Sequence, residues 1–419
     1  MKVCVLGMGY IGLPTIAVLA NHNMNVLGVD INKEVVDTVN KGLIHIKEPG
    51  LEKLIKEGVK SNKIRASLVP EEADVFIIAV PTPNNNDKYF SCDLDYVLKG
   101  IKMIMPYLKK HNLVIIESTI PPLTTEQYIK PLIESLGFKV GLDIYLVHSP
   151  ERVIPGAIIA ELIHNNRVVG GITPKCADIG KGFYKRFVKG DIIKTDAKVA
   201  ELSKLSENTF RDINIAFANE LTLICRELNI NVLEVIDIAN KHPRVNIHKP
   251  GPGVGGHCIP VDPYFIYSKA PNISRLIKLA RDINNYMPKF VVKNINELIK
   301  PNSKISVFGI TYKANVDDIR NSPALEIIRL LRDKGYKVEI YDPYIKEYSN
   351  NLNEVLNNSN LLLILADHKE YKNLDYKKVS ELMQKPLIFD TRNCLDINNK
   401  DIEIINYGNI YKLNEIKKV

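Results

Sequence analysis

The sequence predicts an α/β protein with two Rossmann-like, doubly wound parallel-sheet domains joined by a central domain of long helices. Short apolar runs alternate with helical stretches in the first part of the chain, and again after residue 301. Between these parts, apolar residues recur at three- and four-residue steps with no strand pattern. We therefore expect domains at residues 1–196, 197–300 and 301–419.

The first part of the chain contains five apolar runs that we interpret as strands. A helical stretch separates each run from the next, beginning with LPTIAVLANHN after the first. Parallel strands need crossovers of this kind, so the order predicts one parallel sheet. The runs are KVCVL (2–6), NVLGVD (25–30), DVFIIAV (74–80), LVIIES (113–118) and DIYLVHSP (143–150).

The rest of the chain reads as helix and then again as strand and helix. Helices are expected from Ala197 to about Asn240 and from about Ser274 to Lys300, with a glycine- and proline-rich loop (249–263) between them. Both α/β parts start with a strand that ends in a glycine turn, and the next strand ends in Asp. The later elements are KISVFGI, the helix SPALEIIRLLRDKG, KVEIYDP, LLLILA and PLIFDTR.

Composition and charge bear on whether the protein binds nucleic acid or a smaller phosphate-bearing ligand. Of the 419 residues, 45% are hydrophobic and 25% charged, as in ordinary globular proteins. The net charge of +8 comes from scattered lysines and arginines, without the basic stripe and aromatic platforms that nucleic-acid binding favours. A phosphate-bearing ligand explains the excess equally well. We expect no nucleic-acid partner.

Cysteine spacing and hydropathy indicate the cellular compartment in which the protein is expected. The six cysteines are far apart and form no CxxC pair, so neither a disulfide framework nor a zinc cluster is expected. MKVCVLGMGYIG begins like a signal peptide, but glycines interrupt it and no cleavage site follows. No window reaches the length of a membrane span, so we expect a cytoplasmic protein without a membrane partner.

The first glycine turn, GMGYIG, predicts a dinucleotide site. Gly7, Gly9 and Gly12 follow a strand and open a helix, which lets a pyrophosphate approach the helix N-terminus. Asp30 ends the next strand 23 residues after Gly7, where its carboxylate accepts hydrogen bonds from a ribose diol and repels a 2′-phosphate. This favours NAD over NADP. The alternative is a strand–helix junction that binds nothing.

Polar residues end later strands on the same edge. Thr82 in VPTP, Thr119 in EST and Glu151 in SPERVIPG are candidates for the pocket, although strand-end hydroxyls are also common without a function. In the helical region, Lys204 and Asn208 share a face, and Asn219 returns close to it. Such a stripe is either functional or a solvated face.

The loop PGPGVGGHCIPVDP places Cys258 behind several glycines and four residues before Asp262. Taken alone, the thiol is better explained as a buried, inert cysteine. Its neighbours change this interpretation, because glycines clear space and prolines hold the backbone. The sequence therefore indicates a rigid loop built around one thiol.

Six motifs in order resemble those of the UDP-sugar 6-dehydrogenases (the UDP-glucose/UDP-mannose dehydrogenase family). They span essentially the whole chain: GMGYIG, STIPPLTT, SPERVIPG, ELSKLSENTF, GPGVGGHCIPVDP and GITYKANVDDIRNSPALE. The resemblance implies oxidation of a primary alcohol at carbon 6 of a nucleotide sugar to a carboxylate, with two NAD⁺. It also implies an NAD domain, a helical dimerisation domain, a UDP-binding domain and a homodimer or homotetramer.

The resemblance assigns roles to the candidate residues. Cys258 is the nucleophile that traps the aldehyde as a thiohemiacetal, whose oxidation gives a thioester that water hydrolyses. Lys204 and Asn208 stabilise the alkoxide. Asp262 handles a proton or activates water, and Glu151 and Thr119 position water. The division of labour among Lys204, Asp262 and Glu151 stays open.

By the same resemblance, further residues bind the two ligands. Arg320 reaches the cofactor phosphates, for which its planar fork is suited, unless it is merely an exposed charge at a helix cap. Gly253, Gly255 and Gly256 let sugar and nicotinamide approach. The cofactor set is Gly7, Gly9, Tyr10, Ile11, Gly12, Asp30, Lys33, Pro81, Thr82, Thr119 and Arg320. The substrate set is Glu151, Arg152, Val153, Lys204, Asn208, Arg244, His248, Gly253, Gly256, Tyr312 and Lys313.

The cysteine loop also bears on the sugar. UDP-glucose members read GGSCFPKD where this chain has GGHCIPVD, so His257 and Val261 depart from that pattern. The chain is similar to the subgroup acting on UDP-N-acetylhexosamines, above all to the UDP-N-acetyl-D-mannosamine dehydrogenases. The resemblance then implies that Arg244 and His248 contact the sugar or the diphosphate, either in their own subunit or in a neighbouring one. A metal held by the histidines and Cys258 is rejected, because a ligand thiolate is no free nucleophile.

Other functions remain as alternatives. UDP-N-acetyl-D-glucosamine comes next as the substrate, followed by UDP-glucose. A two-electron hydroxyacid dehydrogenase shares the first domain and the helical region but needs no cysteine. A nucleotide-sugar sensor without catalysis is the alternative from another class.

Overall fold

The computed structural model describes residues 1–397 and 399–416, which form two compact units. Unit 1 comprises residues 1–207 and 264–271, and unit 2 comprises residues 208–263 and 272–419. The division falls within one continuous helix, α8 (Ala197–Leu228). The three domains expected from the sequence remain a prediction, and residues 398 and 417–419 of the third lie outside the described part.

Unit 1 is built on an eight-stranded sheet with the order β3-β2-β1-β4-β5-β6-β7-β8. Neighbouring strands are parallel except β6 and β7, which are antiparallel. All five predicted strands are confirmed: β1 has the predicted bounds, and the other four are slightly shorter. The strands are β1 (Lys2–Leu6), β2 (Asn25–Val29), β3 (Ile64–Ser67), β4 (Val75–Ile78), β5 (Leu113–Ile116), β6 (Tyr145–His148), β7 (Arg167–Gly171) and β8 (Ile192–Asp196).

The three remaining strands, β3, β7 and β8, were not predicted, and each omission has a physical reason. β3 alternates buried and exposed residues over four positions, and β8 has no buried residue at all. β7 (RVVGG) is short and ends in two glycines, which are poor strand residues. None of them forms the continuous apolar run of a strand buried on both faces. The antiparallel β7 also makes this sheet mixed rather than purely parallel.

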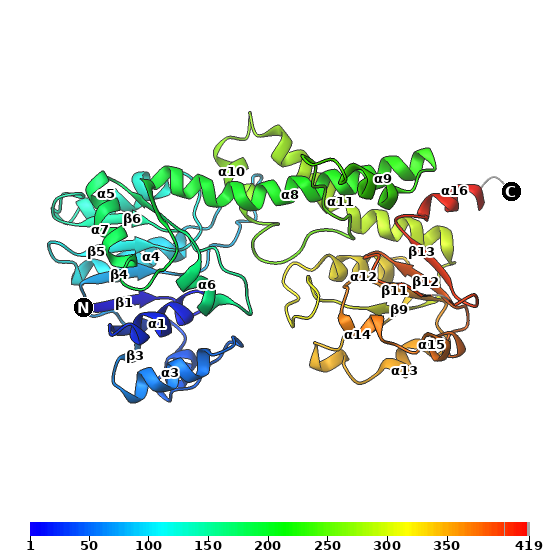
Figure 1. Cartoon of the computed structure of the whole chain (residues 1–419), viewed down its shortest axis with the longest axis horizontal. Coiled ribbons are helices and arrows are strands. Elements are labelled where there is room, and N and C mark those ends of the chain that lie inside the picture. The colour runs from blue at the N-terminus through cyan, green and yellow to red at the C-terminus, as the bar shows by residue number, and fades with distance from the viewer. Residues whose placement is uncertain (398, 417–419) are drawn as a thin grey trace. The chain divides into compact units, whose positions relative to one another are not determined.

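Helices cover both faces of this sheet (Figure 1). In that view α1 and α3 lie below the strands and α5 above them. The helices and helical turns of unit 1 are α1 (Gly12–Asn21), α2 (Lys33–Asn40), α3 (Leu51–Lys60), α4 (Asp95–Ile104), η1 (Met105–Tyr107), η2 (Thr125–Ile129), α5 (Lys130–Glu134), α6 (Ile158–His164), α7 (Pro174–Tyr184), the start of α8, and most of α10 (Asp262–Lys269).

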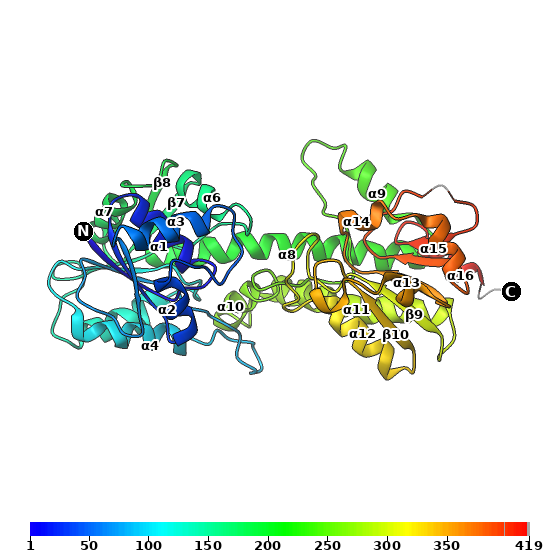
Figure 2. The same ribbon diagram turned by 90° about the horizontal axis from the view of Figure 1, so that it is seen from below.

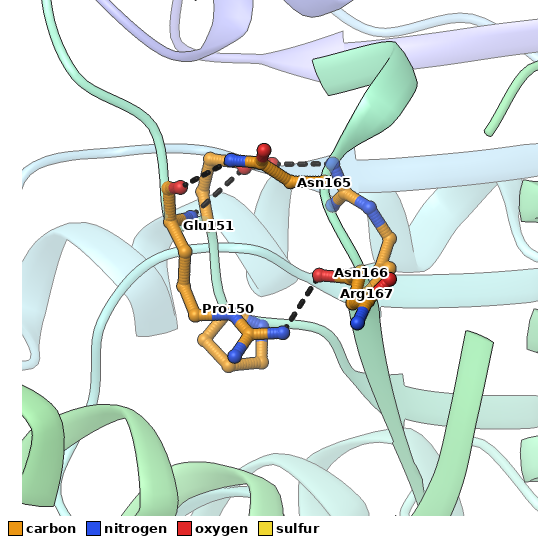
Figure 3. A pocket seen from close by; sticks show the side chains of 6 residues that line it. Pro150, Glu151, Asn165, Asn166 and Arg167 are labelled. Carbon is orange, nitrogen blue, oxygen red and sulfur yellow. Dashed lines mark hydrogen bonds and ion pairs between the residues drawn. The ribbon is translucent and has the colours of Figure 1, made fainter. Parts of the chain in front are cut away.

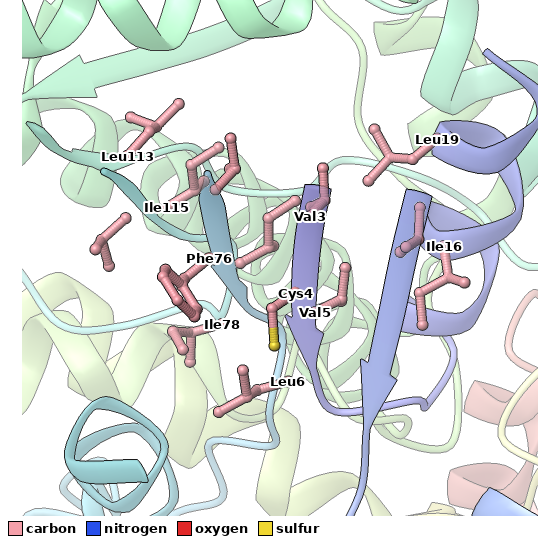
Figure 4. Close-up of a cluster of buried hydrophobic side chains, with 14 of the residues drawn as sticks. Val3, Cys4, Val5, Leu6, Ile16, Leu19, Phe76, Ile78, Leu113 and Ile115 are labelled. Carbon is pink, nitrogen blue, oxygen red and sulfur yellow. The ribbon is translucent and has the colours of Figure 1, made fainter. Parts of the chain in front are cut away.

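The core of unit 1 follows from the alternation of side chains along its central strands (Figure 4). Val5 is paired with Gly28, where a Cβ atom would lie only 2.8 Å from Cδ1 of Ile16 on α1. Leu6 and Ile78 point to the opposite face, toward α4. Burial of each such aliphatic side chain contributes about 1.5–3 kcal/mol to the stability of the folded state. The strands, and therefore the polar residues at their ends, are held in place by this packing.

Unit 2 contains a five-stranded, fully parallel sheet with the order β10-β9-β11-β12-β13. Four of its strands were predicted; β13, which has one buried residue, was not. The strands are β9 (Lys304–Phe308), β10 (Lys337–Tyr341), β11 (Leu361–Ile364), β12 (Leu387–Asp390) and β13 (Glu403–Asn406). Two hydrophobic clusters, one on each face, take alternate residues of the central strands.

Helices again cover both faces of this sheet. α11 and α12 pack side by side on one face, whereas α13, α14 and α15 lie on the other (Figures 1 and 2). The helices and helical turns of unit 2 are the rest of α8, α9 (Val232–Ala239), α11 (Arg275–Leu298), α12 (Pro323–Asp333), η3 (Lys346–Tyr348), α13 (Leu352–Leu356), α14 (Lys369–Lys372), α15 (Tyr376–Leu382), η4 (Ile410–Lys412) and α16 (Leu413–Ile416).

The helical stretch predicted from Ala197 to about Asn240 is in fact two helices. The break lies at Asn229, whose φ of 58° is left-handed, and Asn231 caps α9 by accepting from the N–H groups of Leu233 and Glu234. Within the described part of the chain, no helix combines the length and apolarity that a membrane crossing requires.

Candidate active site

The three glycines of the first turn have three different surroundings. Gly7 has a φ of 91°, in the left-handed region, and a side chain there would overlap the carbonyl oxygen of Ala79. A Cβ on Gly12 would overlap the carbonyl oxygen of Gly7. A Cβ on Gly9 would meet nothing within 4 Å, so the space above this residue is open at the start of α1. The turn therefore offers room for a pyrophosphate.

Asp30 organises the same turn. One carboxylate oxygen accepts from the N–H of Met8 at 2.9 Å, and the other accepts from the N–H of Asn32 at 2.9 Å. The acid is only half-buried, so lone pairs remain for a ribose diol. Lys33, the residue after Asn32, forms an exposed ion pair with Asp37 at 2.6 Å.

The ends of β4 and β5 are fastened together by Ser118. Its hydroxyl accepts from the N–H of Val80 at 2.9 Å and donates to the carbonyl of Val80 at 2.8 Å. This links the segment holding Pro81 and Thr82 to the segment holding Thr119. Thr82 and Thr119 are both half-buried, which is suitable for residues that line a ligand site.

Glu151 is held by a buried arginine. Its carboxylate accepts from Nη2 of Arg167 at 2.6 Å, and the two residues line a small pocket with Arg152 and neighbouring polar residues (Figure 3). Arg152 forms an ion pair with Glu207 at 2.9 Å and donates to the carbonyl of Asn166. Val153, beside them, is half-buried. The SPERVIPG segment is therefore anchored on both sides.

A second buried carboxylate, Glu201 on α8, holds the STIPPLTT segment. It accepts from the N–H groups of Leu123 and Thr125 at 2.6 and 2.8 Å and from the Thr125 hydroxyl at 2.6 Å. Burial, opposed by these hydrogen bonds, raises the pKa of Glu201 to about 7. Lys204 lies one turn further along α8, half-buried, and forms no ion pair with any residue that the structure describes.

In unit 2, Asn208 contacts the cysteine loop directly. Its side-chain amide donates to the carboxylate of Asp262 at 2.6 Å, and both residues are buried. The N–H of Asp262 donates to the carbonyl of Cys258 at 2.9 Å, so a tight turn joins the thiol to the acid at the start of α10. Cys258 is half-buried, unlike four of the other cysteines, which are fully buried.

Further along α8, a buried polar network supports the same loop. Asn219 accepts from the N–H of Gly251 at 2.9 Å and donates to the side chain of Asn284 at 2.8 Å. Asn284 in turn donates to Asp212, which is paired with Arg281 at 2.7 Å. The polar stripe of α8 is therefore an internal support for the loop rather than a solvated face.

The glycines near Cys258 pack closely against other parts of unit 2. A Cβ on Gly255 or Gly256 would lie 2.8 Å from Tyr312, and one on Gly253 would lie 2.8 Å from Pro323. Protein atoms, not open space, fill these positions. Close packing of the loop against residues 312–323 therefore requires glycine at these positions, and the approach of sugar and nicotinamide to them stays a prediction.

The remaining predicted residues of unit 2 fall in two places. Arg320 is ion-paired with Asp318 at 2.6 Å, its Nη2 lies 3.2 Å from Nδ1 of His257, and its carbonyl accepts from the N–H of Gly256. Lys313 is exposed close by in sequence. Arg244 is exposed and His248 half-buried on a separate loop.

Burial and the nearby charge of Arg211 lower the pKa of His248, so its ring is neutral at pH 7. Among the described residues, no three His, Cys, Asp or Glu side chains are grouped as a metal ion requires.

Sequence reasoning missed the supporting residues of the site. Arg167, Glu117 and Tyr184 surround Glu151 or its partner, and Glu201 and Asn284 hold two motif segments. The signal available was the presence of charged or amide residues within otherwise apolar elements. Such residues are common on exposed faces, so their burial could be known only from the folded chain.

The comparisons with known proteins cover the whole chain. Descriptions of the UDP-glucose/GDP-mannose dehydrogenase family match its NAD binding domain at residues 1–188, its central domain at 198–286 and its UDP binding domain at 306–397. The UDP-N-acetyl-D-mannosamine dehydrogenase of Methanocaldococcus jannaschii is 47% identical over 403 residues, covering 94% of this chain and 93% of that protein.

Comparison with solved structures finds proteins of the same kind as the sequence comparison does. The UDP-N-acetyl-mannosamine dehydrogenase of Staphylococcus aureus superposes with a TM-score of 0.91 at 51% identity, covering 99% of this chain and 100% of that one. A UDP-D-ManNAc dehydrogenase of Pyrococcus horikoshii gives 0.93 at 41% identity, covering 98% and 100%. With all three family domains present in order, this protein belongs to the UDP-glucose/GDP-mannose dehydrogenase family of NAD-dependent enzymes.

Proposed function

We propose that the protein oxidises UDP-N-acetyl-D-mannosamine to UDP-N-acetyl-D-mannosaminuronate in two steps at Cys258. The observation that carries the proposal is the cysteine loop: a half-buried thiol joined by a tight turn to a buried acid, which Asn208 holds in place. An alcohol dehydrogenase that stops at the aldehyde needs no such thiol. Relatives carrying the name of this activity are 45–47% identical over most of the chain.

The thiol keeps the intermediate on the protein. NAD⁺, when bound, accepts one hydride in each of the two oxidations. Between them, the Cys258 thiolate adds to carbon 6 of the aldehyde and forms a thiohemiacetal. Loss of the second hydride leaves a thioester. Water then attacks this carbonyl, and the acid departs as the thiolate is regenerated.

The charged and polar residues act on the oxygen atoms of the reaction: the alkoxide oxygen of the substrate and the oxygen of the attacking water. The Lys204 ammonium stabilises the alkoxide, and the Asn208 amide contributes a fixed donor. Asp262 accepts a proton from the attacking water. Glu151 and Thr119 orient that water, and the Glu151 carboxylate is fixed for this purpose by Arg167.

The most direct test of the substrate is an NADH assay with UDP-ManNAc, UDP-GlcNAc, its galacto epimer and UDP-glucose at equal concentration. We expect UDP-ManNAc to have the highest kcat/KM and to yield two NADH per sugar. Fastest turnover of UDP-GlcNAc would make that sugar the substrate. Fastest turnover of UDP-glucose would show that His257 and Val261 were misinterpreted.

The thiol is tested with Cys258→Ser. We expect this variant to release no uronate and to stall after the first oxidation, as judged by mass spectrometry of the sugar. Full uronate production would contradict the covalent mechanism and favour a two-electron hydroxyacid dehydrogenase. If the unchanged protein produced no NADH with any of the UDP-sugars, the alternative of a non-catalytic nucleotide-sugar sensor would be favoured.

We also infer a homodimer or homotetramer in the cytoplasm. In unit 2, α8 exposes a row of apolar side chains at helical spacing: Phe210, Phe217, Ile224 and Leu228 are 67%, 48%, 46% and 60% exposed. Such a row is unusual on a monomer and supports association through the helix. The six cysteines are all free, which supports a reducing compartment.

A further inference from the structure

A fully buried charged cluster lies behind Glu151 in unit 1. Arg167 donates to the Glu151 carboxylate at 2.6 Å through Nη2, and its Nη1 lies 3.6 Å from the Glu117 carboxylate. The Tyr184 hydroxyl donates to the same Glu117 oxygen at 2.8 Å, and the Arg167 guanidinium lies over the Tyr184 ring at 4.5 Å. The side chains of Arg167, Glu117 and Glu151 are 5%, 1% and 8% exposed.

The antiparallel strand is what brings these groups together. Glu117 and Glu151 follow β5 and β6 at the carboxyl edge of the parallel strands, where open α/β sheets bind their ligands. Because β7 runs in the opposite direction to β6, its first residue, Arg167, lies at this same edge. A parallel β7 would have placed Arg167 at the far end of the sheet.

The cluster contains two carboxylates and one guanidinium, so one negative charge is in excess in a buried place. Burial, with the Glu151 charge adding to it and Arg167, Tyr184 and Thr15 opposing it, raises the pKa of Glu117 to about 7. Glu117 is therefore the group that takes up the compensating proton. The Arg167 guanidinium is also closer to Glu151, at 2.6 Å, than to Glu117, at 3.6 Å.

We propose that Arg167 is a positioning residue of the reaction, which holds the Glu151 carboxylate in one orientation, while Glu117 behind it carries the balancing proton. The proposal rests on the proposed function, because Glu151 is there the residue that orients water for thioester hydrolysis. A planar guanidinium holds a carboxylate in one orientation, which a lysine cannot do. The step affected is hydrolysis, not the preceding oxidations.

The decisive variant is Arg167→Lys, with Arg226→Lys as its matched control. Arg226 is also buried and pairs with Glu297 at 2.5 Å, but it lies near the end of α8, 18 residues after Asn208. We expect R167K to lower kcat by about 10²-fold, the cost of misplacing a reacting group, and to change KM for the sugar less than about threefold. R226K should keep kcat within about threefold.

Transient kinetics distinguishes positioning from a general structural role. If hydrolysis alone is slowed, R167K shows a burst of NADH followed by a slow steady rate, with a thioester on Cys258 detectable by mass spectrometry. Equal losses of kcat in R167K and R226K that follow their melting temperatures, without a burst, would overturn the proposal. So would an R167K enzyme with unchanged kcat.

Two further variants keep the proposal testable if R167K does not fold. Glu117→Gln should make the ratio of its kcat to that of the unchanged enzyme vary with pH around 7, because it removes the titrating proton. Tyr184→Phe removes a donor that stabilises ionised Glu117 and should move this transition to higher pH. A pH-independent ratio with E117Q would contradict the proposal. Absence of turnover by the unchanged enzyme would instead contradict the proposed function.

Discussion

At the scale of single residues, the glycine turn shows that one motif combines separate physical requirements. Gly7 supplies a left-handed backbone, Gly12 lets a helix approach the turn, and Gly9 leaves space open. Only the last of these concerns a ligand. The three positions should therefore respond differently to the same added methyl group.

We predict that Gly12→Ala destabilises the protein by about 1–3 kcal/mol or more, because its Cβ overlaps the Gly7 carbonyl. Gly9→Ala should change the free energy of unfolding by less than about 0.5 kcal/mol, since nothing lies near that Cβ. It should still weaken NAD binding. Thermal unfolding and NAD titration by calorimetry check both, and a G9A enzyme with normal NAD affinity would contradict the assignment.

Glu117 makes stability depend on pH. Its pKa is about 7 in the folded protein, chiefly through burial, against an ordinary value of 4.5. Because the folded state holds the proton more tightly, the contribution is fully present below pH 4.5 and is lost as pH rises through 7. We predict a steeper loss of stability between pH 5 and 8 for the unchanged protein than for Glu117→Gln, by roughly 1–3 kcal/mol.

Urea unfolding at several pH values measures this difference. Gln at position 117 can keep the acceptor for the Tyr184 hydroxyl, so the variant resembles the protonated acid. Parallel stability curves for the two proteins would show that Glu117 is ionised throughout.

Among the elements, α8 carries the two asparagines that contact the cysteine loop, Asn208 and Asn219. Periodicity was enough to predict a helix, because apolar residues at three- and four-residue steps bury one face. It could not tell whether Asn208 and Asn219 face water or protein, since amides occur in both settings. Their burial depends on α11 and the cysteine loop, which are far away in the sequence.

We predict that Asn219→Leu lowers stability by about 1–3 kcal/mol for each buried group left without its partner, namely the Gly251 N–H and the Asn284 amide. The loop should also lose definition, and kcat should fall. Glu220→Gln, at the exposed neighbouring position, is the control and should change neither. Thermal unfolding and steady-state kinetics of both variants make the test.

The strand β7 was the largest error at this scale. Alternation of strand and helix predicts parallel strands, and a segment ending in two glycines gave no strand signal. Its direction depends on pairing with β6 and β8, which a local pattern does not contain. Arg167 was missed for the same reason, since it becomes part of the site only through that direction.

At the scale of the whole molecule, the exposed row on α8 bears on assembly. We predict that Phe217→Glu shifts the protein toward the monomer at micromolar concentration, because a charge in an apolar interface costs several kcal/mol. Ile193→Glu, which changes an exposed apolar residue on β8, should leave the mass unchanged. Analytical ultracentrifugation measures both, and a monomeric unchanged protein would contradict the proposed homo-oligomer.

Local periodicity and short-range spacing were enough to predict the two sheets, the long helices, the glycine turn of the NAD domain and the loop around Cys258. Tertiary structure decided which polar residues are buried, why the glycines beside Cys258 are needed, and which way β7 runs. These depend on partners distant in the chain. Glu151 shows the difference: its motif marked it, but only the fold brought Arg167 to its carboxylate.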